Sequence, residues 1–196
     1  MPVDALGLTV VSSTTTPHRR IRRAPEVAER EILDAAEALL AERSYRELSV
    51  DELMRRTGMT RSSFYHYFGS LDELAVALLG RVQAEMVQAA APWVATAAQT
   101  DDPAGNIENG ILGVARVFAS HGPVLAAIDE AAHHHQTVEQ AWREGVLAPW
   151  ITAIATQVRA NRDRGLTAIE EPEEVAATLS RIWIAALYPE GLLGRG

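Results

Sequence analysis

The chain has 196 residues, of which 47% are hydrophobic and 22% charged, a composition typical of globular proteins with one or two domains. It contains no cysteine, which excludes disulfides and thiolate chemistry. No apolar run approaches the ~20 residues of a membrane span, and no basic segment precedes the apolar start as in a signal peptide. We therefore expect a cytoplasmic protein without a membrane partner.

The net charge of −8 is unevenly distributed along the chain. Residues 1–85 contain 11 arginines and 13 acidic residues, whereas residues 86–196 contain 7 and 13, so the two parts carry −2 and −6. Salt screens surface charges that lie more than ~8–10 Å apart. The acidic second part is therefore compatible with a nucleic-acid interface in the first, provided that arginines lie on the face that docks.

The first 23 residues are predicted to form a disordered basic arm. Residues 1–18 show little periodicity and include a Ser/Thr cluster that ends at Pro17. Four arginines follow: Arg19, Arg20, Arg22 and Arg23. They are either a solvated charge run or an arm that lies along phosphates or enters a narrow minor groove. Their place directly before the helix-turn-helix motif described below favours the arm.

Three helices are expected next. The first covers about residues 26–43, with Ile32, Ala36, Leu39 and Leu40 as its buried stripe. Ser49 and Glu52 form a capping box that opens the second helix, which ends near Gly58. Arg55 and Arg56 lie in its last turn, where they oppose the helix dipole, and this role is favoured over phosphate contact.

Thr60 is a good N-cap for the third helix. Phe64 and Phe68, four residues apart, share one face and should plug this helix into a small core. The other face presents donors of the kinds that meet phosphates and base edges. A helix, a glycine-containing turn and a second helix with a polar face form a helix-turn-helix motif. The candidate DNA-binding residues are the four arm arginines together with Ser49, Thr60, Arg61, Ser62, Ser63, Tyr65, His66 and Tyr67.

These residues carry a specific resemblance. Leu48-Ser49-Val50 with Leu53, Thr57-Gly58-Met59-Thr60-Arg61, Phe64-Tyr65-His66-Tyr67-Phe68, and Ser70 with Glu73-Leu74 resemble the DNA-binding signature of TetR-type repressors over about residues 26–80. The resemblance implies a helix-turn-helix domain over residues 24–70. It also implies a helical ligand-binding and dimerisation domain over residues 71–196. The family usually has Lys where this chain has Leu71, which removes one expected phosphate contact.

The second part of the chain also reads as helical, so the predicted fold class is all-α. A long helix starts at Leu71 and runs to about residue 90, where Pro92 breaks or kinks it. Asp102 caps the next helix, whose stripe is Ile107, Ile111, Val114 and Phe118. Further helices are expected over about residues 123–133, over 138–164 with Gly165 as a left-handed stop, and from 172 to 188.

Large aromatic side chains recur on these later helices. Their simplest interpretation is ordinary core packing, but several wide rings from different helices also suit the lining of an apolar ligand cavity. Pro149 withholds the N–H that would bind the carbonyl of Gly145, so that acceptor needs water, a side chain or a ligand as its donor. Ser120-His121, the spacing to Trp142, and residues 161–165 resemble the EthR-like subgroup, whose members hold lipid-like molecules in an aromatic tunnel. The candidate ligand-binding residues are Trp93, Phe118, Trp142, Gly145, Trp150 and Trp183.

Metal binding and catalysis are disfavoured. The neighbouring residues His133, His134 and His135 would point about 100° apart on a helix, so they cannot converge on one ion, and solvated imidazoles are the better interpretation. The chain has no glycine-rich phosphate loop and no GxSxG motif. We expect no cofactor and no enzymatic activity.

The sequence therefore predicts a homodimeric repressor that binds a pseudo-palindromic operator and is released by a small hydrophobic ligand. The last helix places Leu179, Ile182, Trp183 and Ala186 on one apolar stripe suited to dimerisation. About one helix fewer than the family's usual nine is expected, which bears on the dimer interface. Two alternatives stay open: a DNA-binding regulator whose cavity is filled by side chains, and an enzyme or ligand carrier that only resembles the family.

Overall fold

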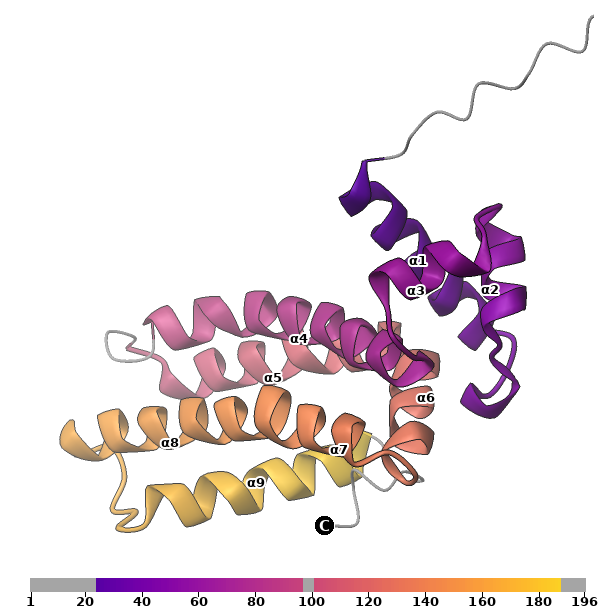
Figure 1. Ribbon diagram of the computed structural model, residues 1–196. Helices are drawn as coiled ribbons and strands as arrows, with labels where there is room; N and C mark the ends of the chain where they lie inside the picture. The colour runs from indigo at the N-terminus through magenta and orange to yellow at the C-terminus, as the bar shows by residue number, and fades with distance from the viewer. Residues whose placement is uncertain (1–23, 97–100, 188–196) are drawn as a thin grey trace, which may run out of the picture.

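The computed structural model describes residues 24–96 and 101–187. Within these ranges all regular secondary structure is helical (Figure 1). The predicted all-α fold class is confirmed. A small N-terminal group of helices, called the head below, lies at one end of an elongated bundle. The head consists of α1 (Pro25–Leu40), the 3-10 turn η1 (Tyr45–Glu47), α2 (Val50–Thr57) and α3 (Arg61–Tyr67).

Local capping explains where the head helices begin and end. The Ser49 hydroxyl accepts a hydrogen bond from the Glu52 N–H at 3.4 Å, and α2 ends at Gly58, whose φ of 67° is costly for residues with a Cβ. The Thr60 hydroxyl accepts from the Ser63 N–H at 3.2 Å at the start of α3. The expected stripe of α1 is buried, and Phe64 and Phe68 pack into the same core.

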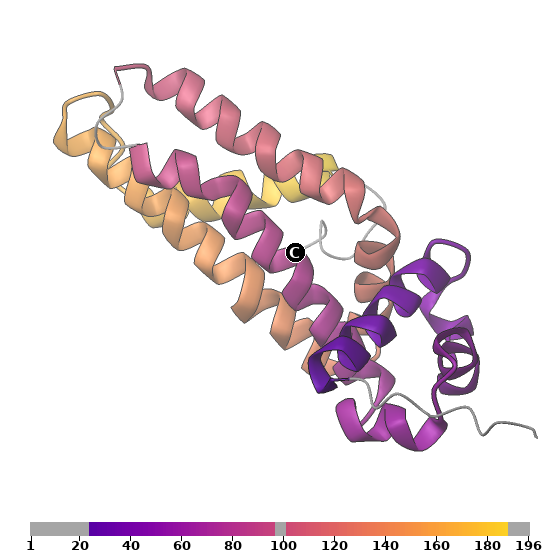
Figure 2. The same ribbon diagram turned by 90° about the horizontal axis from the view of Figure 1, so that it is seen from above.

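The bundle contains α4 (Leu71–Thr96), α5 (Pro103–Ser120), α6 (Gly122–Ala132), α7 (Gln136–Trp142), a π-helical segment η2 (Arg143–Leu147), α8 (Ala148–Asp163) and α9 (Pro172–Leu187). α4 runs along α5, and α8 runs along α9 (Figure 2). The short α6 lies beside the head and contacts α1 and η1. Within the described ranges no single helix is long and apolar enough to cross a membrane. The helix pair α5–α6, which is bent by 78°, reaches the required length and apolar composition when its two helices are taken together.

Two helices differ from expectation. α4 continues through Pro92 to Thr96. Both Pro92 and Gln88, whose carbonyl loses its helical partner there, are exposed, so water can bind that carbonyl and the helix can continue. The helix expected over residues 138–164 is helical throughout but changes pitch at η2, where the Ala148 N–H bonds the Arg143 carbonyl five residues back. Gly165, with φ of 74°, follows α8 as expected.

Candidate DNA-binding face and tryptophan cleft

The face of the head opposite its core carries most of the predicted DNA-binding residues. Ser49, Thr60, Arg61, Ser62, Tyr65 and His66 are exposed, whereas Ser63 and Tyr67 are half-buried. The Thr60 hydroxyl, besides capping α3, lies 2.8 Å from that of Ser63 and 3.2 Å from that of Ser62. Tyr67 packs partly against the head core, so only part of its ring is free for a phosphate. The four arm arginines lie outside the described residues.

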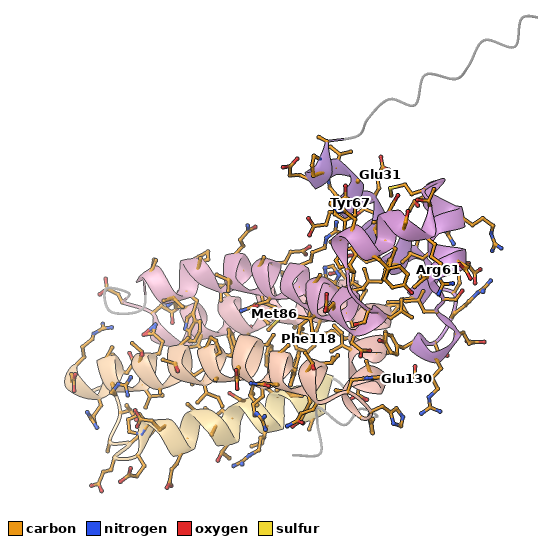
Figure 3. The ribbon with its side chains drawn as sticks, viewed as in Figure 1. Glu31, Arg61, Tyr67, Met86, Phe118 and Glu130 are labelled. Atoms are coloured by element: carbon orange, nitrogen blue, oxygen red, sulfur yellow. The ribbon has the colours of Figure 1, made fainter. Side chains whose placement is uncertain are left out.

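Arg61, labelled in Figure 3, makes side-chain hydrogen bonds to Asp51 and Tyr65. Its Nη1 donates to both carboxylate oxygens of Asp51, at 3.0 and 2.9 Å, and its Nη2 donates to the Tyr65 hydroxyl at 3.2 Å. The guanidinium carbon also lies 5.7 Å from the centre of the Tyr65 ring. The hydrogen bond to Tyr65 and the carboxylate of Asp51 raise the pKa of Arg61 above its ordinary value.

Three neighbouring arginines of the head also have carboxylate partners. Arg43 and Arg55 bind Glu52 at 2.5 and 3.3 Å, and Arg56 binds Glu42 at 3.1 Å. Arg55 and Arg56 lie in the last turn of α2, as the sequence predicted, and their opposition to the helix dipole stays a prediction. The acidic partners were missed because Glu52 was interpreted as part of a capping box with Ser49 and Asp51 was given no role of its own.

A polar cluster joins the head to the bundle, and sequence reasoning missed it as well. The Tyr45 hydroxyl donates to Asp72 on α4 at 2.7 Å, and His135 binds the other oxygen of Asp72 at 2.9 Å. Glu130 on α6 accepts from the Tyr45 backbone N–H at 2.8 Å and from Arg46 Nε at 2.8 Å. Figure 3 shows Glu130 at this junction.

The histidine triplet takes part in this junction. Besides the contact of His135 with Asp72, His134 Nε2 lies 3.1 Å from an Arg46 nitrogen, and His133 Nδ1 lies 2.8 Å from the Asp129 carbonyl. The three imidazoles thus have three different partners. Among the residues that the structure describes, no group of three or more His, Cys, Asp or Glu side chains is placed to hold a metal ion.

An apolar cleft of about 330 Å³ opens between α4, α5, α8 and α9, and we call it the tryptophan cleft. Three of the predicted ligand-binding residues, Trp93, Trp150 and Trp183, line it. The indoles of Trp150 and Trp183 stack at 5.3 Å between ring centres, and Trp93 lies 5.6 Å from Trp150. The remaining wall is formed by Ile107, Ile111, Ile154, Gln157, Val158, Asn161, Leu179, Ile182 and Ala186.

Phe118 and Trp142 lie behind this wall. Both are buried, and their ring centres are 6.4 Å apart. The ring centres of Phe118 and Trp183 are 5.5 Å apart, so the rings form a continuous series into the core. These two residues therefore support the cleft from behind without being part of its lining.

Gly145 lies elsewhere, on a groove of about 360 Å³ between α4, η2 and α8 that shares only Trp150 with the tryptophan cleft. Its carbonyl, expected to need water, a side chain or a ligand as donor, accepts a hydrogen bond from the side-chain amide of Gln83 on α4. Of the three expected kinds of donor, the structure shows a side chain.

Unpaired polar atoms instead occur around the tryptophan cleft. The indole nitrogens of Trp93 and Trp150 and the side-chain oxygen of Asn161 are buried, and none has a hydrogen-bond partner among the described residues. All three residues line the cleft. Buried polar groups are normally hydrogen-bonded, so this combination of two donors and one acceptor calls for explanation.

Comparisons with known proteins agree with this arrangement. The family model described as "Bacterial regulatory proteins, tetR family" matches residues 32–78. The HTH-type transcriptional regulator EthR of Mycobacterium tuberculosis (strain ATCC 25618 / H37Rv) is 31% identical over 85% of this chain and 77% of its own. EthR of Mycolicibacterium smegmatis is 28% identical over 92% of this chain and 96% of its own.

Solved structures share the fold. A TetR-family transcriptional regulator from Mesorhizobium loti has a TM-score of 0.71 at 17% identity, covering 88% of this chain and 92% of that one. SmeT in complex with triclosan has a TM-score of 0.64 at 20% identity, covering 86% and 85%. The helix-turn-helix head, the helical bundle and these relatives together show that the chain belongs to the TetR family, in the EthR-like subgroup, and is a DNA-binding transcriptional regulator.

Proposed function

We propose that this regulator is a repressor that binds a pseudo-palindromic operator in the cytoplasm as a homodimer, and that a small neutral, largely apolar ligand in the tryptophan cleft releases it. The DNA-binding set is the exposed face of α3 with Ser49 and Thr60, assisted by the arm arginines. Arg61 reads a base edge, because it stands in the first turn of α3 and keeps free donors.

The observation that carries the ligand proposal is the set of unpaired polar atoms around an apolar cleft. Leaving a buried donor or acceptor unpaired costs about 1–3 kcal/mol. A ligand with a carbonyl-like acceptor for an indole N–H and a donor for the Asn161 oxygen could offset part of that cost after small side-chain rotations. No Asp, Glu, Lys or Arg occurs among the described residues that line the cleft, so a charged ligand would lose its hydration without a partner there.

Support for a ligand-filled cleft also comes from a structural relative. SmeT, described as the repressor of the Stenotrophomonas maltophilia multidrug efflux pump SmeDEF, has been solved with triclosan. In this chain, ligand binding would favour a spacing of the two heads that misses successive major grooves. A ligand can shift that equilibrium only by as much as its affinity differs between the two spacings.

The dimer proposal rests on α9. Leu179 and Ile182 are 48% and 62% exposed, although both also border the tryptophan cleft. A two-fold contact along this helix would cover them and supply the self-complementary interface that a palindromic site requires. Light scattering at micromolar concentration should detect a dimer; monomers alone, with and without operator, would contradict the proposal.

The function is tested by selecting operator fragments from host genomic DNA and measuring their binding with and without ligand. Triclosan and a series of neutral N-aryl amides are suitable probes, and carboxylate analogues of the same size are the matched control. We expect release by neutral compounds only. Operator binding that no neutral compound weakens would leave a regulator with a side-chain-filled cavity, and failure to select any DNA would contradict operator binding itself.

A further inference from the structure

The Arg61–Asp51 pair links the two helices of the helix-turn-helix motif. Asp51 lies in the first turn of α2, and Arg61 is the first residue of α3. Their side chains are 72% and 58% exposed, so the pair is largely in water. Exposed ion pairs add little to stability, and this one is therefore poorly explained as a device that holds the fold together.

The pair instead affects what Arg61 can contact. The Nη1 of the guanidinium donates to both oxygens of Asp51, and Nη2 donates to the Tyr65 hydroxyl. A guanidinium has five N–H donors in a rigid fork, so donors remain for a base edge even while these partners are kept. The side chain that would read DNA is thus held in position before DNA arrives.

We propose that Asp51 is a specificity-determining residue: it positions Arg61 for a base edge and opposes the contact of Arg61 with phosphates. This inference rests on the proposed base-reading role of Arg61. Phosphates attract any exposed arginine regardless of sequence, and that attraction supplies essentially all non-specific binding. The Asp51 carboxylate, bound to the Arg61 guanidinium, repels a phosphate and so offsets the attraction between that phosphate and Arg61. Guanine presents neutral acceptors to the guanidinium, so this repulsion does not apply to it.

The neighbouring pairs support this interpretation. Three further arginines form ion pairs with carboxylates: Arg43 and Arg55 with Glu52, and Arg56 with Glu42. The described head therefore offers few cations near Arg61 that lack an acidic partner. Specific binders often gain discrimination by making the wrong contact unfavourable as well as the right one favourable. Asp51 would do this at the position where sequence is read.

The test is the full-length Asp51→Asn variant, which removes the charge and keeps the shape. Affinity for a random-sequence duplex should rise at least about threefold, while operator affinity should stay constant or fall, so that the ratio of the two decreases. The log–log salt slope on random duplex should steepen by up to ~0.9, the value for one additional neutralised phosphate. Circular dichroism checks that the variant is folded.

Glu173→Gln is the matched control. Glu173 also lies in the first turn of a helix and also pairs with an arginine of another helix, Arg159. That helix, α9, begins at the end of the bundle away from the head (Figure 1). This variant changes the net charge by the same amount and should leave the affinity ratio unchanged. An equal effect of both variants would reduce Asp51 to a contribution to net charge and overturn the proposal.

A double-mutant cycle with Arg61→Ala isolates the coupling. If Asp51 acts through Arg61, Asp51→Asn should have no effect on the affinity ratio in the Arg61→Ala background. A persistent effect there, or equal gains on both kinds of DNA in the single variant, would overturn the inference. If duplex DNA is bound but Arg61→Ala leaves the selected consensus unchanged, base reading by Arg61 fails and this inference fails with it. If no duplex is bound, operator binding itself fails.

Discussion

The hydroxyl of Tyr45 donates a 2.7 Å hydrogen bond to Asp72, and this bond ties the 3-10 turn of the head to the first turn of α4. Asp72 also binds His135, and Glu130 binds the backbone of Tyr45 from α6. One buried tyrosine thus contacts two elements of the bundle. Any change of head spacing that accompanies ligand binding must preserve these bonds or break them.

Tyr45 should make folding stability depend on pH in the alkaline range. Burial, the hydrogen bond to Asp72 and the negative charges of Asp72 and Glu130 raise the pKa of Tyr45 well above its ordinary value. The folded state therefore keeps a proton that the unfolded state loses above about pH 10. This contribution to stability is fully present below that pH and is lost as the pH rises above it.

The variant Tyr45→Phe lacks the hydroxyl, so its stability should not show this contribution to the alkaline decline. Near neutral pH it should lower the free energy of unfolding by about 1.5–3 kcal/mol, the range for a hydrogen bond to a charged group. Urea unfolding from pH 8 to 11 should then give a shallower alkaline decline than in the parent protein. Tyr65→Phe, at an exposed position, controls for removal of a phenol; parallel curves for parent and Tyr45→Phe would contradict the prediction.

Gln83 should contribute more to the free energy of unfolding than an ordinary surface glutamine. Its amide donates to the Gly145 carbonyl, which Pro149 leaves without a helical partner. Gln83→Leu should destabilise the protein by about 1–3 kcal/mol because a part-buried acceptor loses its donor. Gln140→Leu is the control, since Gln140 is exposed and donates to Glu144, which is also exposed; denaturant unfolding should place it within about 0.5 kcal/mol of the parent.

Filling the tryptophan cleft should imitate a bound ligand. Ile111 lines the cleft and is 42% exposed, whereas the adjacent Leu112 is 43% exposed and does not line it. Ile111→Trp should weaken operator binding and make it insensitive to triclosan and to neutral N-aryl amides, and Leu112→Trp should do neither. Normal operator binding and a normal ligand response in Ile111→Trp would show that regulation does not pass through this cleft.

Removal of residues 1–23 should affect DNA binding without affecting the fold. The log–log salt slope of operator binding should shrink by up to ~0.9 for each phosphate that an arm arginine no longer neutralises, and thermal unfolding should stay nearly unchanged. Deletion of residues 1–18 is the matched control because it keeps all four arginines. A slope that is the same in both deletions would show that the arginines are only a solvated charge run.

Local chemistry made much of the head predictable. The caps at Ser49 and Thr60 and the stop at Gly58 depend on residues within one turn of the chain, and each was found where the sequence predicted it. The Phe64–Phe68 pair was equally readable, because residues four apart share a helix face. Agreement of local signals with the family signature explains why the fold class was predicted correctly.

Contacts between distant residues were not predictable in the same way. Pro149 indicated that the Gly145 carbonyl lacked a helical donor, but nothing local identified Gln83, 62 residues earlier, as the replacement. Periodicity placed Ile111 in a buried stripe, yet it is partly exposed where the tryptophan cleft opens between α5 and α9. A hydrophobic stripe indicates which face of a helix is apolar and leaves open whether protein, ligand or a second subunit covers it.

The π-helical segment η2 determines the direction in which the side chains of α8 point relative to those of α7. Trp142 and Trp150 are eight residues apart, which in a regular helix of 3.6 residues per turn would place them about 80° from each other. The wider turn at η2 slows the rotation, and both rings meet the same aromatic series through Phe118 and Trp183. If the same eight residues took the regular pitch instead, the side chains of α8 would turn by about 80°, carrying Trp150 out of both the groove and the cleft that it now separates.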